Sequence, residues 1–251
     1  MQMGFIGSGN MARALARGWG EPVLCTDSGS GRARSLVAEL GGEVAASNAE
    51  LAERCEALLL CHKPAQLEQV ASEVGARARV VVSVLGAVPL SRLREAYPDA
   101  ALVRTMPNIA VEVRQGVTCL CSEDGTDAAV LEWVRERFTA LGSLFELPER
   151  LMGVATATAG VAPAYVSLVA EAQIDAAVKH GLTPAQAGQI VTDSLLGSAK
   201  LLRARGFDTL GVRREVTSPG GSTARGLAAL ERGGLRSAFV DAMEAVLETR
   251  A

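Results

Sequence analysis

The chain has 251 residues, of which 49% are hydrophobic, 21% charged and 4% aromatic, and its formal net charge is -3. This composition is typical of a globular protein that buries its core without disulfide bonds. The slight acidity disfavours sequence-independent nucleic-acid binding, and two histidines with five scattered cysteines provide neither a histidine-rich metal site nor a CxxC pair. We therefore expect no metal site and no nucleic-acid partner.

Two apolar segments bear on location. The first, Met3 to Ile6, lies so near the start that no cleavable signal sequence fits before it, so we expect a cytoplasmic protein. The second, Leu151 to Ala170, has no charged residue and the length of a bilayer span. Because it consists mostly of Ala, Gly, Thr and Pro, we predict a buried interface helix and no membrane partner.

Short β-branched runs alternate with helical patterns between residues 1 and 148. The predicted strands are Met3 to Ile6, Val23 to Thr26, Ala57 to Cys61, Val80 to Val84, Leu102 to Thr105, Val117 to Cys121 and Ser143 to Phe145. Helices are predicted at Met11 to Trp19 and at Arg32 to Leu40, after the first two strands. This alternation indicates an α/β domain with a doubly wound parallel sheet of the Rossmann type.

From residue 149 to 251 the strand pattern disappears and helical periodicity continues. Thr183-Pro184-Ala185-Gln186 has the residues of a helix start, with an N-cap, a proline in the first turn and a capping-box glutamine. The last predicted helix has an apolar stripe formed by Leu235, Phe239, Ala242, Met243, Val246 and Leu247. Such helices have more apolar surface than one chain can bury, so we predict an all-helical dimerisation domain.

The motif Gly7-Ser8-Gly9-Asn10-Met11-Ala12 follows the first predicted strand and opens the first helix. It has the spacing of the GxGxxA dinucleotide fingerprint. Gly7 permits a tight turn and Gly9 lets the backbone approach a pyrophosphate, which the helix N-terminus attracts. We predict that the residues from Gly7 to Met11 bind a dinucleotide.

The choice between NAD and NADP is expected just after the second strand. Asp27 lies about twenty residues beyond Gly7, where a carboxylate can bind the ribose 2′-hydroxyl of NAD. Ser28 and Arg32 follow closely and could instead hold the 2′-phosphate of NADP. Alternatively, Asp27 and Ser28 only cap a helix. The sequence leaves NADP or NAD open.

Further candidates stand at the carboxyl ends of later strands, in Cys61-His62-Lys63-Pro64, Leu85-Gly86 and Met106-Pro107-Asn108. Ligands of doubly wound folds lie at this edge of the sheet. The cofactor-binding residues predicted here are Lys63, Pro64, Leu85, Gly86 and Asn108. Asn108 offers a donor and an acceptor, or simply fills a turn. His62 lies near the expected nicotinamide, but a single histidine beside a strand end is more often structural.

The segment Thr217-Ser218-Pro219-Gly220-Gly221-Ser222-Thr223 precedes a predicted helix. Its glycines and hydroxyls form a pattern in which bare backbone N–H groups bind an anion, and a carboxylate suits such a site. The predicted substrate-binding residues are Ser218, Gly220, Gly221, Ser222 and Thr223. Alternatively, Ser222 or Thr223 serves only as an N-cap.

Together these segments resemble pyrroline-5-carboxylate reductase over almost the whole chain. The matching segments are Phe5 to Ala12, Lys63-Pro64, Val103 to Asn108, Pro163-Ala164-Tyr165 with Glu171-Ala172, Asp175 to Val178 with Gly181-Leu182, and Val216 to Glu231. The resemblance implies reduction of a cyclic imino acid to proline, the last step of proline biosynthesis. It further implies Thr223 as the catalytic residue and an interleaved helical homodimer, sometimes in larger rings.

The chain departs from the family pattern at three places. Asn108-Ile109-Ala110 stands where the family usually has Asn-Thr-Pro, Ala159 to Ala162 replaces Ser-Gly-Ser-Gly, and Asp193-Ser194 replaces Gln-Thr. A β-hydroxyacid-type reductase, with Lys179 or Lys200 as its lysine, and a nucleotide-binding homologue without turnover are therefore kept as alternatives.

Overall fold

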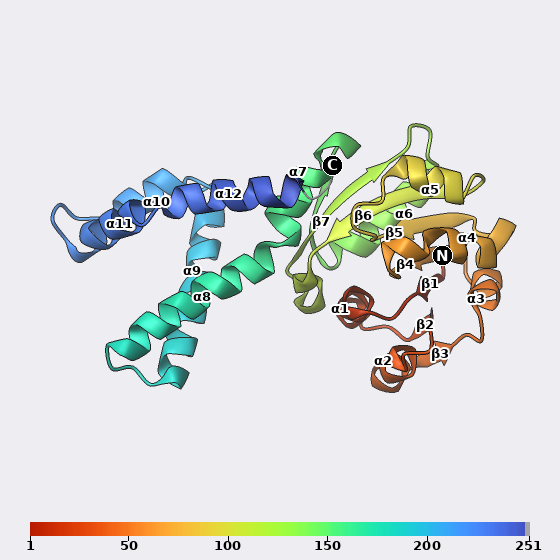
Figure 1. The fold of residues 1–251 in the computed structure, drawn as a ribbon, viewed down its shortest axis with the longest axis horizontal. Helices are drawn as coiled ribbons and strands as arrows, with labels where there is room; N and C mark the ends of the chain where they lie inside the picture. Colours follow the sequence, from red (N-terminus) through yellow and green to blue (C-terminus); the bar gives the residue numbers. More distant parts are fainter. Residues whose placement is uncertain (249–251) are drawn as a thin grey trace. The chain divides into compact units, whose positions relative to one another are not determined.

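The computed structural model describes residues 1–248, which form two compact units. The first is Met1–Pro163 and the second begins at Ala164. The first holds an eight-stranded sheet with helices on both faces, and the second is all helical (Figure 1). The domain boundary near residue 148 stays a prediction.

The sheet confirms the predicted doubly wound architecture. Its strands are β1 (Met3–Ile6), β2 (Val23–Thr26), β3 (Gly42–Val44), β4 (Ala57–Leu60), β5 (Val80–Ser83), β6 (Ala101–Pro107), β7 (Gly116–Ser122) and β8 (Gly142–Glu146). They lie in the order β3-β2-β1-β4-β5-β6-β7-β8. The order reverses between β1 and β4, which is the point where ligands bind in folds of this kind.

Two features of the sheet differ from the prediction. The short edge strand β3 was not predicted, and its Gly42 is required because a Cβ there would lie 1.9 Å from the carbonyl oxygen of Val23. The sheet is also not parallel throughout, since β7 runs antiparallel to β6. Only the 3₁₀ turn η3 (Ile109–Val113) joins these two strands, and a parallel return needs a longer crossover.

Helices cover both faces of the sheet. The helices α1 (Asn10–Trp19), α2 (Arg32–Leu40) and α6 (Ala128–Thr139) contribute to one hydrophobic cluster. The other cluster is formed with α3 (Asn48–Arg54), α4 (Leu67–Val74), α5 (Leu90–Ala96) and α7 (Met152–Ala155). Short 3₁₀ turns are η1 (Pro64–Gln66), η2 (Gly75–Arg77) and η4 (Glu149–Leu151).

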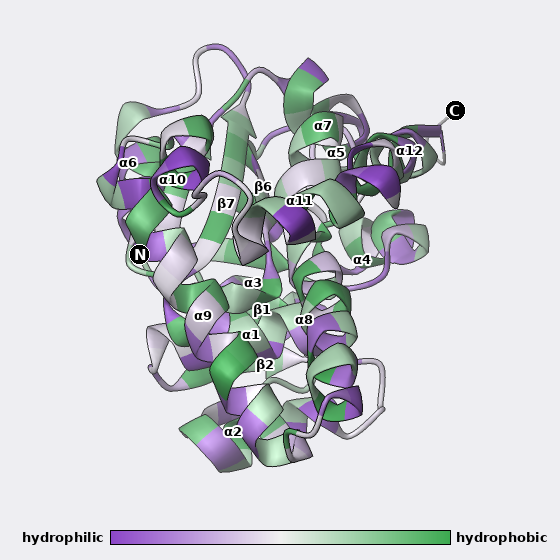
Figure 2. Cartoon of the chain, turned by 90° about the vertical axis from the view of Figure 1, so that its left-hand side faces the viewer, coloured by the Kyte–Doolittle hydropathy of each residue, from purple (hydrophilic) through white to green (hydrophobic). Residues whose placement is uncertain are grey.

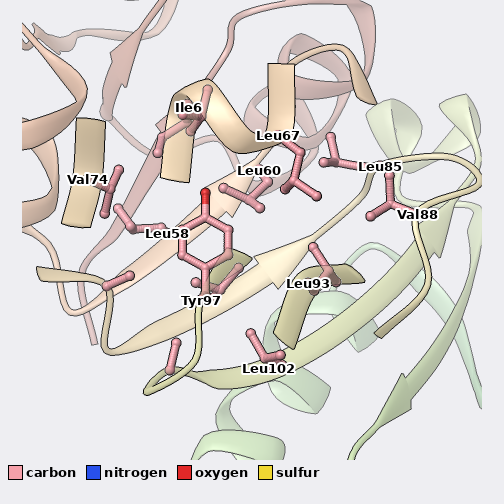
Figure 3. Packing of buried hydrophobic residues seen from close by; sticks show 14 of the residues in the cluster. Ile6, Leu58, Leu60, Leu67, Val74, Leu85, Val88, Leu93, Tyr97 and Leu102 are labelled. Atoms are coloured by element: carbon pink, nitrogen blue, oxygen red, sulfur yellow. The ribbon is translucent and has the colours of Figure 1, made fainter. Parts of the chain in front are cut away.

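The period of two along the strands divides the core between these faces. On β4, Leu58 and Leu60 point into one cluster and Leu59 into the other. Figure 3 shows Leu58 and Leu60 beside Tyr97, within the cluster that α4 and α5 cover. All three leucines are 2% exposed or less, so this strand is buried on both faces, as parallel sheets require.

The second unit contains the helices that follow the sheet. They are α8 (Ala162–Lys179), α9 (Pro184–Ala204), α10 (Thr209–Glu215), α11 (Ser222–Arg232) and α12 (Leu235–Glu248). The capping box at the start of α9 is confirmed: the Thr183 hydroxyl accepts a hydrogen bond from the N–H of Gln186. On α12, Phe239 meets Tyr165 of α8 edge-on, with ring centroids 6.5 Å apart.

This unit has almost no core of its own. Between Ala164 and Glu248, only Ala187 and Val191 are buried. Large apolar side chains on its surface include Val166, Leu168, Ile190, Leu196, Phe239 and Val240. In Figure 2 hydrophobic positions, in green, recur along the ribbons of α8 and α9 between hydrophilic ones. A surface of this kind is expected where another protein surface covers it.

The apolar segment predicted to be a buried helix is indeed helical. The stretch Glu149–Lys179 is long and apolar enough to cross a membrane by length and composition alone, and 17% of its most apolar window is buried. One such helix is weak evidence for a membrane span. In the single chain this helix is mostly uncovered, so the predicted burial is not achieved within one protomer.

Candidate functional site

A cavity of about 820 Å³ opens at the carboxyl ends of β1, β2, β3 and β4. Its base is formed by Ile6, Gly7, Ser8 and Gly9, and its walls by the segments that follow the other three strands. The cavity therefore lies at the switch point of the sheet, and its volume suits a ligand of nucleotide size.

The base of this cavity fits a dinucleotide. Gly7 has a φ of +97°, and a Cβ there would lie 2.8 Å from the backbone carbon of Cys61, so the tight turn requires glycine. Gly9 has ordinary extended dihedrals, and a Cβ built on it would have no atom within 4 Å. Gly9 is also the N-cap of α1, and no side chain caps this helix. The space beside Gly9 is thus open and no capping side chain occupies the first-turn N–H groups of α1, as a pyrophosphate site requires.

Asp27 is engaged by its own loop. Its carboxylate accepts hydrogen bonds from the N–H groups of Gly29 (2.8 Å) and Ala33 (2.9 Å) and from the Ser30 hydroxyl (3.0 Å). Desolvation raises the pKa of Asp27, but these hydrogen bonds outweigh it and hold the pKa below its usual value. The alternative that Asp27 caps α2 therefore describes its contacts in this structure, and a role in selecting NAD is disfavoured.

The rim of the cavity beside this loop is cationic. Ser28 and Arg32 line it and are exposed, and Lys63 lines it from the segment after β4. No ion pair of Arg32 is found within residues 1–248, whereas Arg17 and Arg54 are each bound by two glutamates. An unengaged guanidinium at this position suits a 2′-phosphate.

Four polar residues of the cavity wall were not predicted from the sequence. The Thr26 hydroxyl donates to Oδ1 of Asn48 (2.6 Å), whose Nδ2 donates to Glu73 (2.6 Å). Gln69 binds the other oxygen of the same carboxylate (2.9 Å). These groups come from β2, α3 and α4, which lie far apart in sequence and meet only in the folded unit.

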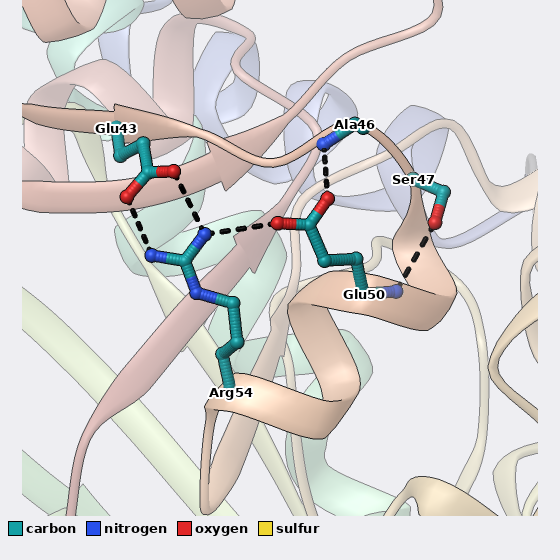
Figure 4. Close-up of polar contacts among 5 residues, drawn as sticks. All are labelled: Glu43, Ala46, Ser47, Glu50 and Arg54. Carbon is teal, nitrogen blue, oxygen red and sulfur yellow. Dashed lines mark hydrogen bonds and ion pairs between the residues drawn. The ribbon is translucent and has the colours of Figure 1, made fainter.

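One local signal could have located this wall. Ser47 accepts a hydrogen bond from the N–H of Glu50 (3.1 Å), and the Glu50 carboxylate accepts one from the N–H of Ala46 (2.8 Å), as Figure 4 shows. Arg54 joins Glu50 to Glu43 of β3. The spacing Ser-x-x-Glu is that of a capping box, so it marks the start of α3 and the loop that holds Asn48.

His62 lies at the cavity but is not arranged as an acid. Its Nδ1 lies 2.9 Å from the carbonyl oxygen of Lys63, and its buried Nε2 has no hydrogen-bond partner within the described residues. Burial lowers the pKa of this imidazole, and the contact with Lys63 and the charge of Glu73 only partly oppose that. A neutral, half-buried histidine agrees with the structural interpretation.

Not every predicted cofactor residue lines the cavity. Those that do are Gly7, Ser8, Gly9, Asp27, Ser28, Arg32 and Lys63. Those that do not are Asn10, Met11, Pro64, Leu85, Gly86 and Asn108. The side chain of Leu85 is part of the hydrophobic core.

The structure differs most clearly from the sequence prediction at Asn108. Its side-chain amide was expected to offer a donor and an acceptor to a ligand, but neither group is free. Its Nδ2 donates to the carbonyl oxygen of Ala159 (3.0 Å), and its Oδ1 accepts from the N–H of Val117 (3.2 Å). The side chain is buried, with the residue 6% exposed. Backbone groups therefore occupy the amide that the sequence assigned to a ligand.

The predicted anion site in the second unit begins at α11. Gly220 has a φ of +69°, and Gly221 is the N-cap, with no side chain capping the helix. The interpretation of Ser222 or Thr223 as an N-cap is therefore wrong, because both residues lie inside the helix. The N–H of Gly221 is not free either, since it donates to the carbonyl oxygen of Ser218 (3.1 Å). The N–H groups of the first helical turn, from Ser222 onward, are the ones suited to a carboxylate.

Comparison with known proteins assigns both parts of the chain. Residues 149–251 match the model for pyrroline-5-carboxylate reductase dimerisation, and residues 2–86 match that for coenzyme F420-dependent NADP oxidoreductases. A pyrroline-5-carboxylate reductase of Synechocystis is 35% identical over 98% of this chain and 95% of its own length. One of Thermus thermophilus is 34% identical over 98% and 95%.

Solved structures agree over the full length. The 1-pyrroline-5-carboxylate reductase of Streptococcus pyogenes has a TM-score of 0.92 at 30% identity and covers 100% of this chain and 98% of its own. The Plasmodium falciparum enzyme, solved with NADP bound, has a TM-score of 0.91 at 27% identity and covers 100% and 97%. The chain therefore belongs to the pyrroline-5-carboxylate reductase family.

Proposed function

We propose that this chain reduces 1-pyrroline-5-carboxylate to L-proline with hydride from NADPH, the last step of proline biosynthesis. The observation that carries the proposal is the open cavity over Gly7 and Gly9 at the switch point of the sheet. It belongs to a chain that is similar over its whole length to pyrroline-5-carboxylate reductases. When bound, the reduced nicotinamide supplies the hydride.

The cofactor is NADPH in this proposal, because Asp27 is engaged in its own loop while Arg32 is not paired. The N–H groups at the start of α1, from Ser8 to Met11, hold the pyrophosphate. Ser28 and Arg32 hold the 2′-phosphate. The nicotinamide lies at the carboxyl edge of the sheet. There it is bordered by Lys63 of the cavity wall and by Pro64 and Gly86, which follow β4 and β5 outside the cavity.

The imino acid is bound by its carboxylate at the first turn of α11. The N–H groups of Ser222, Thr223 and Ala224 donate to it, and Gly220 and Gly221 let it approach the backbone. The Thr223 hydroxyl contacts the ring nitrogen and orients the imine carbon toward the hydride. A cyclic imine is protonated more readily than a ketone, so positioning is the main catalytic contribution and a strong acid is not needed.

The working form is a homodimer through the helices of the second unit, and it could assemble further into larger rings. The exposed apolar side chains of α8, α9 and α12 and the match to the dimerisation model support this. The protein acts in the cytoplasm. All five cysteines are free thiols, which suits a reducing compartment.

The proposal is tested by mixing purified protein with 1-pyrroline-5-carboxylate and following loss of NADPH and NADH in parallel. We expect substrate-dependent oxidation, faster with NADPH. Thr223→Ala should lower kcat/KM about tenfold or more and leave the NADPH dissociation constant unchanged, because it removes one substrate contact. Thr139→Ala, at an exposed position of α6 in the first unit, is the matched control.

The same assay separates the alternatives. Wild-type kinetics in Thr223→Ala would contradict the role of that residue. NADPH binding without oxidation of any imine would favour a homologue without turnover. Reduction of NADP by a β-hydroxy acid, lost in Lys179→Ala or Lys200→Ala, would favour the other reductase class.

A further inference from the structure

The segment that leads from the sheet into α8 contains a π-helical turn, Thr156–Gly160. The N–H of Val161 donates to the carbonyl oxygen of Thr156, five residues back, at 3.2 Å. The Thr156 hydroxyl donates to the carbonyl oxygen of Met152 (2.8 Å). Single π turns inside α-helices are rare and are often found at functional sites.

The sequence explains why the helix is irregular at this point. In a regular α-helix the carbonyl of Ala159 would accept the N–H of the residue four positions on, which is Pro163. Proline carries no backbone N–H, and its ring collides with the carbonyl of the residue four positions before it. The Ala159 carbonyl therefore has no N–H donor four residues on and needs a donor from elsewhere.

Asn108 supplies that donor. Its Nδ2 lies 3.0 Å from the Ala159 oxygen, across 51 positions of sequence. The residue is itself held at three further points: its N–H donates to Val117 (3.1 Å), its Oδ1 accepts from the N–H of Val117 (3.2 Å), and its carbonyl accepts from Val111 (3.2 Å). Asn108 directly follows β6, so the π turn is attached to the carboxyl edge of the sheet through one rigid side chain.

We propose that Asn108 is a positioning residue of the reductase, which holds the π turn against the carboxyl end of β6. This rests on the proposed function, in which hydride passes between a nicotinamide at the sheet edge and an imine held at α11. Without this bond the turn after β6 would shift at the carboxyl edge of the sheet, where the proposed function puts the nicotinamide, and misplacement by about 1 Å can cost a hundredfold in rate. Asn108 does not line the cavity, so we expect the affinity for the cofactor to stay unchanged when it is replaced.

The test uses full-length protein with Asn108→Ala and with Asn108→Asp, which keeps an acceptor for the Val117 N–H but loses the donor to Ala159. We expect kcat to fall about tenfold to a hundredfold in both, with the NADPH dissociation constant within about twofold of wild type. The matched control is Thr105→Val, which removes another buried hydrogen bond of β6, from the Thr105 hydroxyl to Ser83 (3.1 Å), without touching the π turn.

A second substitution supplies the rescue. Pro163→Ala restores an N–H four residues after Ala159 and removes the ring collision, so the carbonyl can take a backbone donor. In that background, removal of the Asn108 amide should lower kcat about threefold or less, and this non-additivity is the expected signature. Equal losses in both backgrounds, or an equal loss in Thr105→Val, would overturn the proposal.

Amide hydrogen exchange keeps this test independent of the reaction. Asn108→Ala should raise exchange between Thr156 and Val161, while Thr105→Val should leave it unchanged. If wild-type protein does not oxidise NADPH with the imine, the proposed function fails. The exchange result then tests by itself whether Asn108 holds the π turn. Unchanged exchange in Asn108→Ala would refute it.

Discussion

Alanine substitutions at the two glycines of the cavity base should have opposite effects. Gly7→Ala should lower the stability of the fold, whereas Gly9→Ala should leave the stability unchanged and weaken cofactor binding. A positive φ costs an alanine about 1–2 kcal/mol, and the Cβ of Gly7→Ala would lie 2.8 Å from the backbone of Cys61. At Gly9 the dihedrals are ordinary and the Cβ meets nothing within 4 Å. Replacing the N-cap glycine by alanine destabilises the helix start by about 0.5–1 kcal/mol. Alanine also lowers the conformational entropy of the unfolded chain, which stabilises the fold by about 0.4–1 kcal/mol and offsets that loss.

The expected shifts in Tm follow from these free energies. Each kcal/mol moves the Tm of a chain of this size by about 2–4 °C. Without cofactor, Gly7→Ala should therefore lower Tm by about 4 °C or more, since the displaced backbone adds to the conformational cost. Gly9→Ala should stay within about 2 °C of wild type.

Cofactor binding should show the reverse pattern for Gly9. A Cβ there would occupy the space proposed for the pyrophosphate and remove one charge-assisted hydrogen bond, about 1.5–3 kcal/mol, so NADPH should bind about tenfold to a hundredfold more weakly. At a hundred times the wild-type dissociation constant, NADPH stabilises wild type by about 2.7 kcal/mol, and a hundredfold weaker variant by about 0.4 kcal/mol.

The assay is thermal unfolding with and without NADPH at one protomer concentration, together with fluorescence titration of NADPH. Wild type should gain about 5–10 °C from the cofactor, and Gly9→Ala about 1 °C if its affinity is a hundredfold weaker or about 3–6 °C if it is tenfold weaker. A Gly9→Ala protein that binds NADPH as wild type does would refute the assignment of this turn to the pyrophosphate. A Gly7→Ala protein with unchanged Tm would refute the strain argument.

The remaining predictions concern the cavity rim and its histidine. Arg32→Ala should raise the KM for NADPH about tenfold and leave that for NADH unchanged, because it removes one ionic contact to the 2′-phosphate; Arg34→Ala is the control, and equal effects on both cofactors would contradict the role. Because the pKa of His62 is lowered by burial, the unfolded chain takes up its proton first, so stability should be lost as pH falls below about 6.5. Denaturant titrations across pH should show a shallower loss in His62→Asn than in His180→Asn, at the exposed histidine, and identical profiles would refute this.

The sequence by itself determined the class of fold and located the glycine turn at the base of the cavity. The β-branched runs, the GxGxxA turn and the Thr183 capping box depend on residues within one or two turns of each other, and all three have the expected local structure. The α11 start was also located from sequence, although its N-cap is Gly221. Short-range patterns of this kind are readable because the backbone preferences that produce them are local.

The tertiary structure decided which side chains remain available to a ligand. Asp27 and Asn108 were both assigned to the cofactor from their positions after strands, yet one is held by its own loop and the other by Ala159, 51 residues away. Likewise, the direction of β7 and the wall formed by Asn48 and Glu73 depend on contacts between distant segments. A hydrogen-bonding group is taken by whichever partner the fold brings within reach, and that partner leaves no mark in the neighbouring sequence.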